Sequence, residues 1–356
     1  MPASTQLRSK NRKTTIYDLA RISGTSPSTV SAVMNGSWRE RRIRESTALN
    51  IKQVAAKHGY TPNLQARGLR KARSGMVGMI IPVHDNRFFA SLGQSFENHA
   101  RERDLCPVIA STLRDPVEEI RIVKTLISYA VEFLFIAGAT NPDALSELCG
   151  AANLPHVFVD LPGKHAPSVT TNNYLGAELL TRKISAPNKA RKNSSIKTKT
   201  YFLGGNASDH ATAQRIAAFT AVISENGDKF EADQIISCGY SPDKAATAIK
   251  ILCDRIGSLP SGLLLNSLTV FEGVMSHFVH LPAEAFEHST IGCYDYDPFA
   301  TFLKFPVHMV RQNSDEMIAR AYELIERKVT DPLVIEVQAE LIPPRTIHKG
   351  RYRELG

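Results

Sequence analysis

The sequence predicts an N-terminal all-α head with a helix-turn-helix, followed by an α/β body of two doubly wound parallel-sheet lobes. The two parts of the chain differ in charge. Residues 1–73 contain 15 Lys and Arg and 3 Asp and Glu, whereas residues 74–356 contain 28 Lys and Arg and 32 Asp and Glu. Helical patterns fill the basic segment, and alternating strand and helix patterns fill the rest. With 356 residues, the chain is expected to form two to three domains.

Two short helices are expected at the start of the head. Thr15 and Asp18 have the spacing of a capping box, and the Ser26-Pro27 pair is a good N-cap followed by a proline at the first helical position. Asn35-Gly36 ends the second helix. A tight turn containing glycine between two such helices predicts a helix-turn-helix. Small side chains that could approach a groove closely are expected on the exposed face of the second helix: Ser28, Thr29, Ser31 and Ala32.

A third helix is expected from about Glu45 to His58. The loop before it, Ser37–Arg42, contains three arginines and the only tryptophan. After it, Asn63–Lys71 has the pattern of one or two helical turns. Such a helix is too short to be stable alone and is expected to order only on binding.

The basic charge of the head favours a polyanionic partner. Nucleic acid is the first choice and an anionic membrane surface the second.

The segments "TIYDLARISGTSPSTVSAVMNG", "HGYTPNLQARGLR" and "SGMVGMIIP" resemble the head, hinge and first strand of the LacI family of regulators. Within that family, "RGLRKARSGMVGMIIP", "YFLGG", "FEGVM" and "FLKFPV" resemble the fructose-repressor (Cra) branch. The resemblance implies that the second helix enters the major groove and that the paired hinge helices of a dimer enter the minor groove. It implies the following DNA-binding residues, to which the basic loop adds two arginines: Tyr17, Ser26, Pro27, Ser28, Thr29, Ser31, Asn35, Arg41, Arg42, Asn63, Ala66 and Leu69.

The chemistry of these residues suits DNA. Arginines neutralise phosphates, hydroxyls and amides bond to phosphates or base edges, and Leu69 could unstack a base step as an apolar wedge. Leu69 could instead be a plain core residue. Many relatives have a long side chain where this chain has Ala32, which cannot make a bidentate contact to guanine.

From Met76 onward, short apolar runs alternate with amphipathic helices, a pattern typical of parallel sheets covered by helices. About 280 residues are too many for one such sheet, so two lobes are expected. Strands are expected at 76–82, 107–111, 132–137, 156–160, 199–203, 262–265 and 290–294, with helices at about 89–103, 117–130, 142–153, 174–184, 209–226, 242–257, 268–279 and 314–328.

The resemblance implies the domain boundaries. The head is expected at 13–60 and the hinge at 61–73. One lobe combines 74–171 with 304–331, the other combines 172–303 with 332–347, and the body is similar to periplasmic binding proteins. The basic segment 186–200 has five Lys and Arg and no acid. It is expected to be a solvated insertion, with a second nucleic-acid contact as the alternative.

Ligands bind at the carboxyl ends of strands in open parallel sheets, and polar residues collect there in this sequence. Carboxylates and amides suit sugar hydroxyls, and an arginine would suit a phosphate. Asp160 and Asp295 could instead be loop caps, Arg215 a helix-surface residue, and Phe88 and Phe89 core residues. The expected effector-binding set, in part implied by the resemblance, is Asp85, Phe88, Phe89, Asp160, Asn173, Arg215, Asn266, Asp295 and Gln312.

Several classes are disfavoured by missing patterns. The sequence has no GxGxxG after the first strand, no Walker loop, no GxSxG elbow and no HExxH, so no enzyme, cofactor or metal site is expected. The segment "LGGNAS" could hold an anion at a helix start, but a plain βα turn is favoured. The five cysteines are widely spaced, and the sequence has no secretory signal and no apolar run of 18 residues. These features predict a cytoplasmic protein without disulfides or membrane spans.

The sequence therefore predicts a transcription regulator, a repressor before an activator, of carbohydrate genes. A homodimer or tetramer would bind a palindromic operator, and a sugar or sugar phosphate in the interlobe cleft would lower its DNA affinity. The fructose-branch resemblance implies a ligand like fructose 1-phosphate, with a free sugar or polyol as the alternative. A sugar-binding protein without a DNA role and a sugar-processing enzyme are disfavoured.

Overall fold

The computed structural model describes residues 14–60, 74–186, 199–226 and 230–345. The chain divides into two compact units, Met1–Ser74 and Gly75–Gly356, which we call the head and the body and describe separately. The hinge prediction for 61–73 lies outside the described residues, and so does nearly all of the basic segment 186–200.

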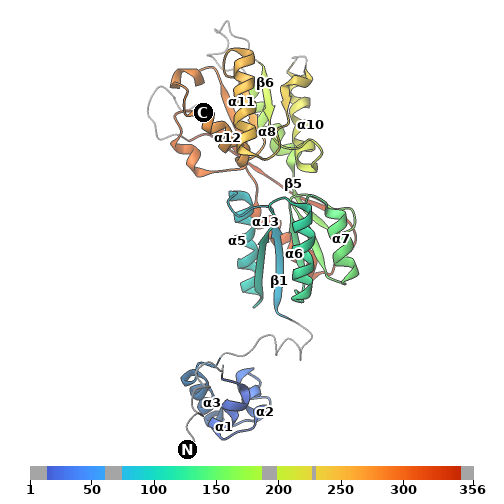
Figure 1. The fold of residues 1–356 in the computed structure, drawn as a ribbon, viewed down its shortest axis with the longest axis vertical. Coiled ribbons are helices and arrows are strands. Elements are labelled where there is room, and N and C mark those ends of the chain that lie inside the picture. The colour runs from blue at the N-terminus through green and yellow to red at the C-terminus, as the bar shows by residue number, and fades with distance from the viewer. Residues whose placement is uncertain (1–13, 61–73, 187–198, 227–229, 346–356) are drawn as a thin grey trace, which may run out of the picture. The chain divides into compact units, whose positions relative to one another are not determined.

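The head contains three helices, α1 (Ile16–Ser23), α2 (Pro27–Met34) and α3 (Glu45–Lys57), as the sequence predicts (Figure 1). The capping box is confirmed, because the Thr15 hydroxyl accepts from the Asp18 amide while the Asp18 carboxylate accepts from the Thr15 amide. The Ser26 hydroxyl caps α2 by accepting from the Thr29 amide at 3.1 Å. All three helices contribute to one small apolar core, formed by Leu19, Ala20, Val30, Val33, Ala48, Ile51 and Ala55.

The expectation that Ala32 lies on the exposed face of α2 is wrong, because only 3% of its surface is exposed. The loop after α2 folds back onto the helix, so that the Ser37 hydroxyl donates to the Ala32 carbonyl oxygen at 3.5 Å. Trp38 and Ile43 of the same loop pack against the head core. Helical periodicity cannot predict such a loop, because it describes the helix without its surroundings.

The body contains two six-stranded sheets. The N-lobe sheet has the order β11-β5-β4-β3-β1-β2, with every pair parallel. Helices α5 and α13 share one apolar core with this sheet, and α6 and α7 share a second (Figure 1). Its elements are β1 (Met76–Ile81), β2 (Cys106–Ser111), β3 (Leu134–Ala137), β4 (His156–Val159), β5 (Ser168–Thr171), β11 (Val334–Val337), α5 (Arg87–Glu102), α6 (Pro116–Ser128), α7 (Pro142–Ala151) and α13 (Ser314–Glu326).

The C-lobe sheet has the order β12-β10-β9-β8-β6-β7, parallel except for the antiparallel β12. Helices α11 and α12 share one apolar core with it, and α8 and α10 share the other. Its elements are β6 (Thr200–Leu203), β7 (Ile235–Ile236), β8 (Gly262–Leu265), β9 (Thr290–Tyr294), β10 (Val307–Arg311), β12 (Glu340–Ile342), α8 (Asn173–Ser185), α10 (His210–Glu225), α11 (Pro242–Ile256) and α12 (Leu268–Phe278), with short 3-10 helices η1 (Ala232–Gln234), η2 (Ala283–Phe286) and η3 (Pro298–Phe302).

The expected lobe boundaries near the C-terminus are wrong in two places. Strand β10 falls within 304–331, which was assigned to the N-lobe, but it pairs with β9 of the C-lobe. Strand β11 falls within 332–347, which was assigned to the C-lobe, but it pairs with β5 of the N-lobe. The chain therefore crosses between lobes after β5, after β10 and after β11. Both strands are short and mix apolar with charged or polar residues, and only backbone pairing decides which sheet such a segment joins.

Candidate functional site

Two aspartates follow corresponding strands of the two lobes. Asp160 comes directly after β4, and Asp295 comes directly after β9. Both have left-handed backbone conformations, with φ of 75° and 83°, which an aspartate tolerates better than most residues. Only 8% of Asp160 and 5% of Asp295 is exposed. The edge of each sheet at which a ligand is expected therefore carries a buried carboxyl group.

Arg215 of α10 lies among these strand ends with only 4% of its surface exposed, which excludes a helix-surface role. Its Nε donates to Asn173 Oδ1 at 2.9 Å, and its Nη1 donates to the Asn266 carbonyl oxygen at 2.6 Å. Its guanidinium carbon lies 3.5 Å from the centre of the Tyr294 ring, a cation–π contact. Among the described residues, Arg215 makes no direct ion pair, so its charge acts on the surrounding carboxyl groups from a distance.

Gln312 connects this site with a crossing between the lobes. Its side-chain nitrogen donates to Asp295 Oδ1, and its side-chain oxygen accepts from the Thr171 hydroxyl. Thr171 ends β5 of the N-lobe, whereas Gln312 follows β10 of the C-lobe. A change at Asp295 can therefore reach both lobes through hydrogen bonds.

Burial raises the pKa of Asp160 to about 6, although the charges of Arg215 and Arg114 oppose this rise. Burial likewise raises the pKa of Asp295, against the charge of Arg215 and the hydrogen bond from Gln312. A raised carboxyl pKa means that the ionised form is less stable in the folded protein than in water. The site therefore holds carboxylates that lack full solvation, a property common at functional sites.

Asp160→Asn is expected to raise the melting temperature at pH 7.5. Because the folded-state pKa lies above the ordinary value, ionisation of this carboxyl group costs the folded protein stability. The cost is full above about pH 6 and shrinks as the pH falls from there toward the ordinary aspartate pKa of about 4. A shift of this size corresponds to about 1 to 3 kcal/mol. Thermal melting at pH 7.5 and pH 5 should show a gain that shrinks at the lower pH. The exposed Asp254→Asn serves as the control, and a variant less stable than wild type at pH 7.5 would contradict the prediction.

Six of the predicted effector residues meet at this site: Asp160, Asn173, Arg215, Asn266, Asp295 and Gln312. Asp85 is exposed and the described contacts do not join it to them, whereas its neighbour Asn86 caps α5 and donates to Thr269 Oγ1 at 3.4 Å. Phe88 and Phe89 are buried in the N-lobe core, as the core interpretation expected. A ligand-facing role for these three residues stays a prediction.

Sequence reasoning missed Arg114, which follows β2. Leu113 and Arg114 both have left-handed backbone conformations, with φ of 54° and 57°. The guanidinium carbon of Arg114 lies 4.3 Å from the ring centre of Tyr240 in the C-lobe and 5.6 Å from that of Phe89. The available signal was its place at the carboxyl end of a strand, the same rule that identified Asp160.

The DNA-binding candidates of the head lie at its surface. Tyr17 is 72% exposed, and Asn35 Nδ2 donates to the Ser31 hydroxyl at 3.2 Å. The candidates Ser26, Pro27, Ser28, Asn35, Arg41 and Arg42 are exposed, and Thr29 and Ser31 are half-buried. The candidates Asn63, Ala66 and Leu69 lie outside the described residues.

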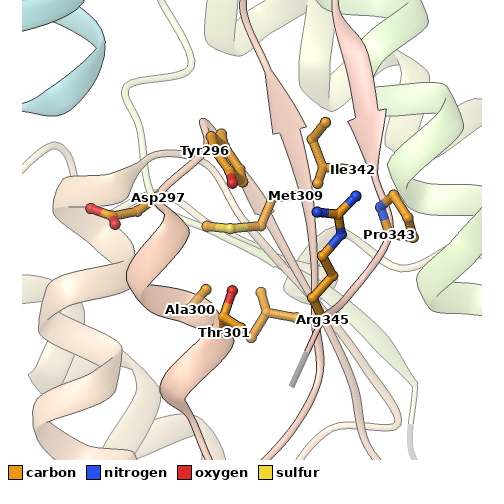
Figure 2. A pocket seen from close by; sticks show the side chains of 9 residues that line it. Tyr296, Asp297, Ala300, Thr301, Met309, Ile342, Pro343 and Arg345 are labelled. Carbon is orange, nitrogen blue, oxygen red and sulfur yellow. The ribbon is translucent and has the colours of Figure 1, made fainter. Parts of the chain in front are cut away.

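A small pocket lies elsewhere in the C-lobe, at the edge of β10 and β12 (Figure 2). None of the six residues at the strand ends lines it. Its lining residues are Tyr296, Asp297, Ala300, Thr301, Val307, Met309, Ile342, Pro343 and Arg345.

Two negative findings apply to the part of the chain that the structure describes. No helix there is long and apolar enough to cross a membrane. Within the same residues, no three His, Cys, Asp or Glu side chains are arranged to hold a metal ion.

Comparison with known proteins points to one family. The family model described as "Bacterial regulatory proteins, lacI family" matches residues 15–63. The ribitol operon repressor of Klebsiella aerogenes is 46% identical over 216 residues, which cover 61% of this chain and 79% of that protein. The sucrose operon repressor of Klebsiella pneumoniae is 29% identical, over 90% of this chain and 93% of that protein.

Solved structures share the fold. The lac repressor dimer bound to operator and the anti-inducer ONPF matches with a TM-score of 0.77 and 18% identity, over 94% of this chain and 99% of that chain. The Cra regulator of Pseudomonas putida in complex with fructose 1-phosphate matches with a TM-score of 0.66 and 20% identity, over 76% of this chain and 98% of that chain. At these identities the likeness concerns the helix-turn-helix head and the two-lobed α/β body alone.

Proposed function

The chain belongs to the LacI family of bacterial regulatory proteins, and on that premise we propose that it represses an operon for carbohydrate or polyol use. Family members of this kind are DNA-binding transcription regulators and not enzymes. The observation that carries the proposal is the buried polar site at the strand ends, where Asp160 of the N-lobe and Asp295 and Arg215 of the C-lobe meet. Such a site can bind a small hydroxylated ligand between the two lobes.

We place DNA recognition on the exposed face of the head, with Tyr17, Ser28 and Asn35 near base edges and Arg41 and Arg42 near phosphates. Two heads on a homodimer would bind a palindromic operator, because a two-fold symmetric protein binds two-fold symmetric DNA. The hinge residues Asn63, Ala66 and Leu69 would enter the minor groove. This activity would take place in the cytoplasm, on the operator.

The effector is a sugar, a polyol or a sugar phosphate. The 46% identity with a ribitol operon repressor supports a polyol. Resemblance to the fructose-repressor branch, together with the shared fold of a Cra structure that contains fructose 1-phosphate, supports a sugar phosphate. In both cases Asp160, Arg215 and Asp295 would bind the effector. The hydrogen bonds through Gln312 to Thr171 would transmit its binding to the N-lobe, which follows the head in sequence.

Fluorescence anisotropy with the full-length protein tests this proposal. DNA selected by the protein from a random library is titrated at several salt concentrations, alone and with sugars, polyols and sugar phosphates. We expect nanomolar binding that weakens steeply with salt and at least tenfold with one ligand class. A scrambled duplex is the control. The proposal would be contradicted if none of these ligands changed the affinity of the protein for any DNA at low or moderate salt.

A further inference from the structure

The chain crosses between the lobes near one edge of each sheet. The crossings follow β5, β10 and β11, and these strands lie at the β11 end of the N-lobe sheet and the β12 end of the C-lobe sheet. Strands β1 and β2 form the opposite end of the N-lobe sheet, and β6 and β7 form that of the C-lobe sheet. Two lobes joined along one edge can open at the other, as around a hinge. Side-chain contacts away from the crossings therefore decide whether the lobes stay closed.

An ion pair joins the two lobes away from the crossings. Arg87 begins α5 directly after the β1 loop of the N-lobe, and its Nε lies 3.2 Å from Asp297 Oδ2 of the C-lobe. Asp297 is fixed, because its Oδ1 accepts from the Phe299 amide at 2.8 Å as the cap of η3. The two side chains are 43% and 25% exposed, so solvent reaches the pair and salt should weaken it.

A hydrogen bond accompanies this ion pair. Asn86 Nδ2 donates to the hydroxyl of Thr269 in α12 at 3.4 Å. The oxygen of the same side chain caps α5 by accepting from the amides of Phe88 and Phe89. Asn86 therefore holds the start of its own helix and also reaches the other lobe. Because Asn86 and Arg87 are consecutive, a movement that separates the lobes breaks both contacts together.

Arg114 makes a further contact between the lobes. It follows β2, at the end of the N-lobe sheet, and its guanidinium carbon lies 4.3 Å from the ring centre of Tyr240, which follows β7 at the end of the C-lobe sheet. The Tyr240 hydroxyl lies 2.9 Å from that of Thr212, which fixes the ring. Within the described part of the chain, the Arg114 guanidinium forms no ion pair or hydrogen bond. Its cation–π contact is therefore what orients it.

We propose that these contacts form an interlobe latch, by which the chain's own side chains hold the two lobes closed on each other. The latch consists of the pairs Arg87 with Asp297, Asn86 with Thr269, and Arg114 with Tyr240. None of these residues is among the six polar residues that meet at the strand ends. Arg87 and Asp297 are positioning residues, which act through the arrangement of the lobes and not by touching the effector.

The latch affects effector binding through the closed fraction of the protein. This consequence rests on the proposed function, in which one ligand contacts both lobes. Such a ligand binds the closed lobes, so its apparent Kd is the intrinsic Kd divided by the closed fraction. A closed fraction that falls to about one fifth raises the apparent Kd about fivefold. Exposed ion pairs contribute little individually, so a single broken contact can shift this balance without unfolding the body.

Hydrogen exchange of the full-length protein without any ligand, measured by mass spectrometry, tests the latch directly. In Arg87→Gln we expect the segments 84–92 and 295–303 to exchange about threefold faster or more, while β3 and β8 keep wild-type rates. Raising NaCl from about 0.05 M to about 0.5 M should have the same effect on wild type and little further effect on the variant. Arg87→Lys keeps the charge and should restore most of the protection. Wild-type exchange of both segments in Arg87→Gln would overturn the latch.

This result cannot come from a weakened helix. A positive charge is unfavourable at a helix N-terminus, so the loss of Arg87 by itself should stabilise α5 and slow its exchange. Arg101→Gln is the control, because it removes an arginine of the same helix that pairs with Glu97 at 2.7 Å within one lobe. It should leave both segments at wild-type rates.

Asp297→Asn separates the latch from the cap of η3. Asparagine caps a helix start as well as aspartate does, so η3 is kept while the ion pair with Arg87 is lost. Combined with Arg87→Gln, it should speed exchange no more than either change alone, because both remove one interaction. Effects that add in the double variant would overturn the pairing of the two residues.

Titration of ribitol, sucrose and fructose 1-phosphate into the protein–operator complex tests the consequence for effector binding. For a compound that releases the operator from wild type, Arg87→Gln and Asp297→Asn should each need a concentration about three- to tenfold higher. An unchanged concentration would overturn the link between the latch and effector affinity. If no compound releases the operator from wild type, the failure belongs to the proposed function, and the exchange experiment still decides the latch.

Discussion

Arg215→Met is expected to abolish the response to the effector while operator binding persists. The guanidinium group donates to Asn173 and Asn266 and lies on the Tyr294 ring, and its charge opposes the raised pKa values of Asp160 and Asp295. Without it, Asp160 and Asp295 lose their main balancing cation. At a binding site, removing one partner of a buried, hydrogen-bonded charged group costs about 2 to 5 kcal/mol, which corresponds to a loss of effector affinity of about thirtyfold or more. Titrating effector into a protein–operator complex measures this loss.

Two further variants control this experiment. Arg215→Lys keeps the charge but loses the planar fork, so its effector affinity should lie between those of wild type and the methionine variant. Arg255→Met removes an exposed arginine of α11 that pairs with Asp233 at 3.3 Å, and such surface pairs contribute little. It should respond as wild type does. A methionine variant at position 215 that releases the operator at wild-type effector concentrations would contradict the prediction.

Leu19→Ala is expected to abolish operator binding while effector binding is unchanged. Leu19 is fully buried at the centre of a head whose core consists of a few side chains from α1, α2 and α3. Leucine-to-alanine changes in a core cost about 2 to 5 kcal/mol. A domain with so small a core has only about 3 to 5 kcal/mol to lose, so most heads should be unfolded at room temperature. The body forms its own compact unit and should keep its fold.

Thermal unfolding and anisotropy together measure this effect. Wild type should show a head transition and a body transition, and Leu19→Ala should lose the first and keep the second. Leu49→Ala is the matched control, because that leucine of α3 is 54% exposed and its loss should cost under about 0.5 kcal/mol. Wild-type operator affinity in the Leu19→Ala protein would show that the head does not depend on this core.

The sequence predicted local structure well where the signals are local. The capping box at Thr15, the cap and proline that begin α2, and the strand and helix of each regular βα unit all follow from side chains within a few residues. The missed strands β5, β7, β10, β11 and β12 are short, and β5 has the polar sequence Ser-Val-Thr-Thr. Such segments become strands because a neighbouring strand offers free backbone hydrogen bonds, which composition does not reveal.

The sequence by itself determined the basic head and the alternation of strands and helices, because these depend on residue type and spacing. The family and most of the polar residues of the site followed from the resemblance of its motifs to known regulators. Only the tertiary structure decided which sheet β10 and β11 join, that Ala32 is buried, and that Arg114 lies against Tyr240 of the other lobe. These residues come from loops and helix ends far apart in the chain. Their contacts depend on how the strand ends of two lobes meet, and the balance of charge at the site follows from distances that no local pattern encodes.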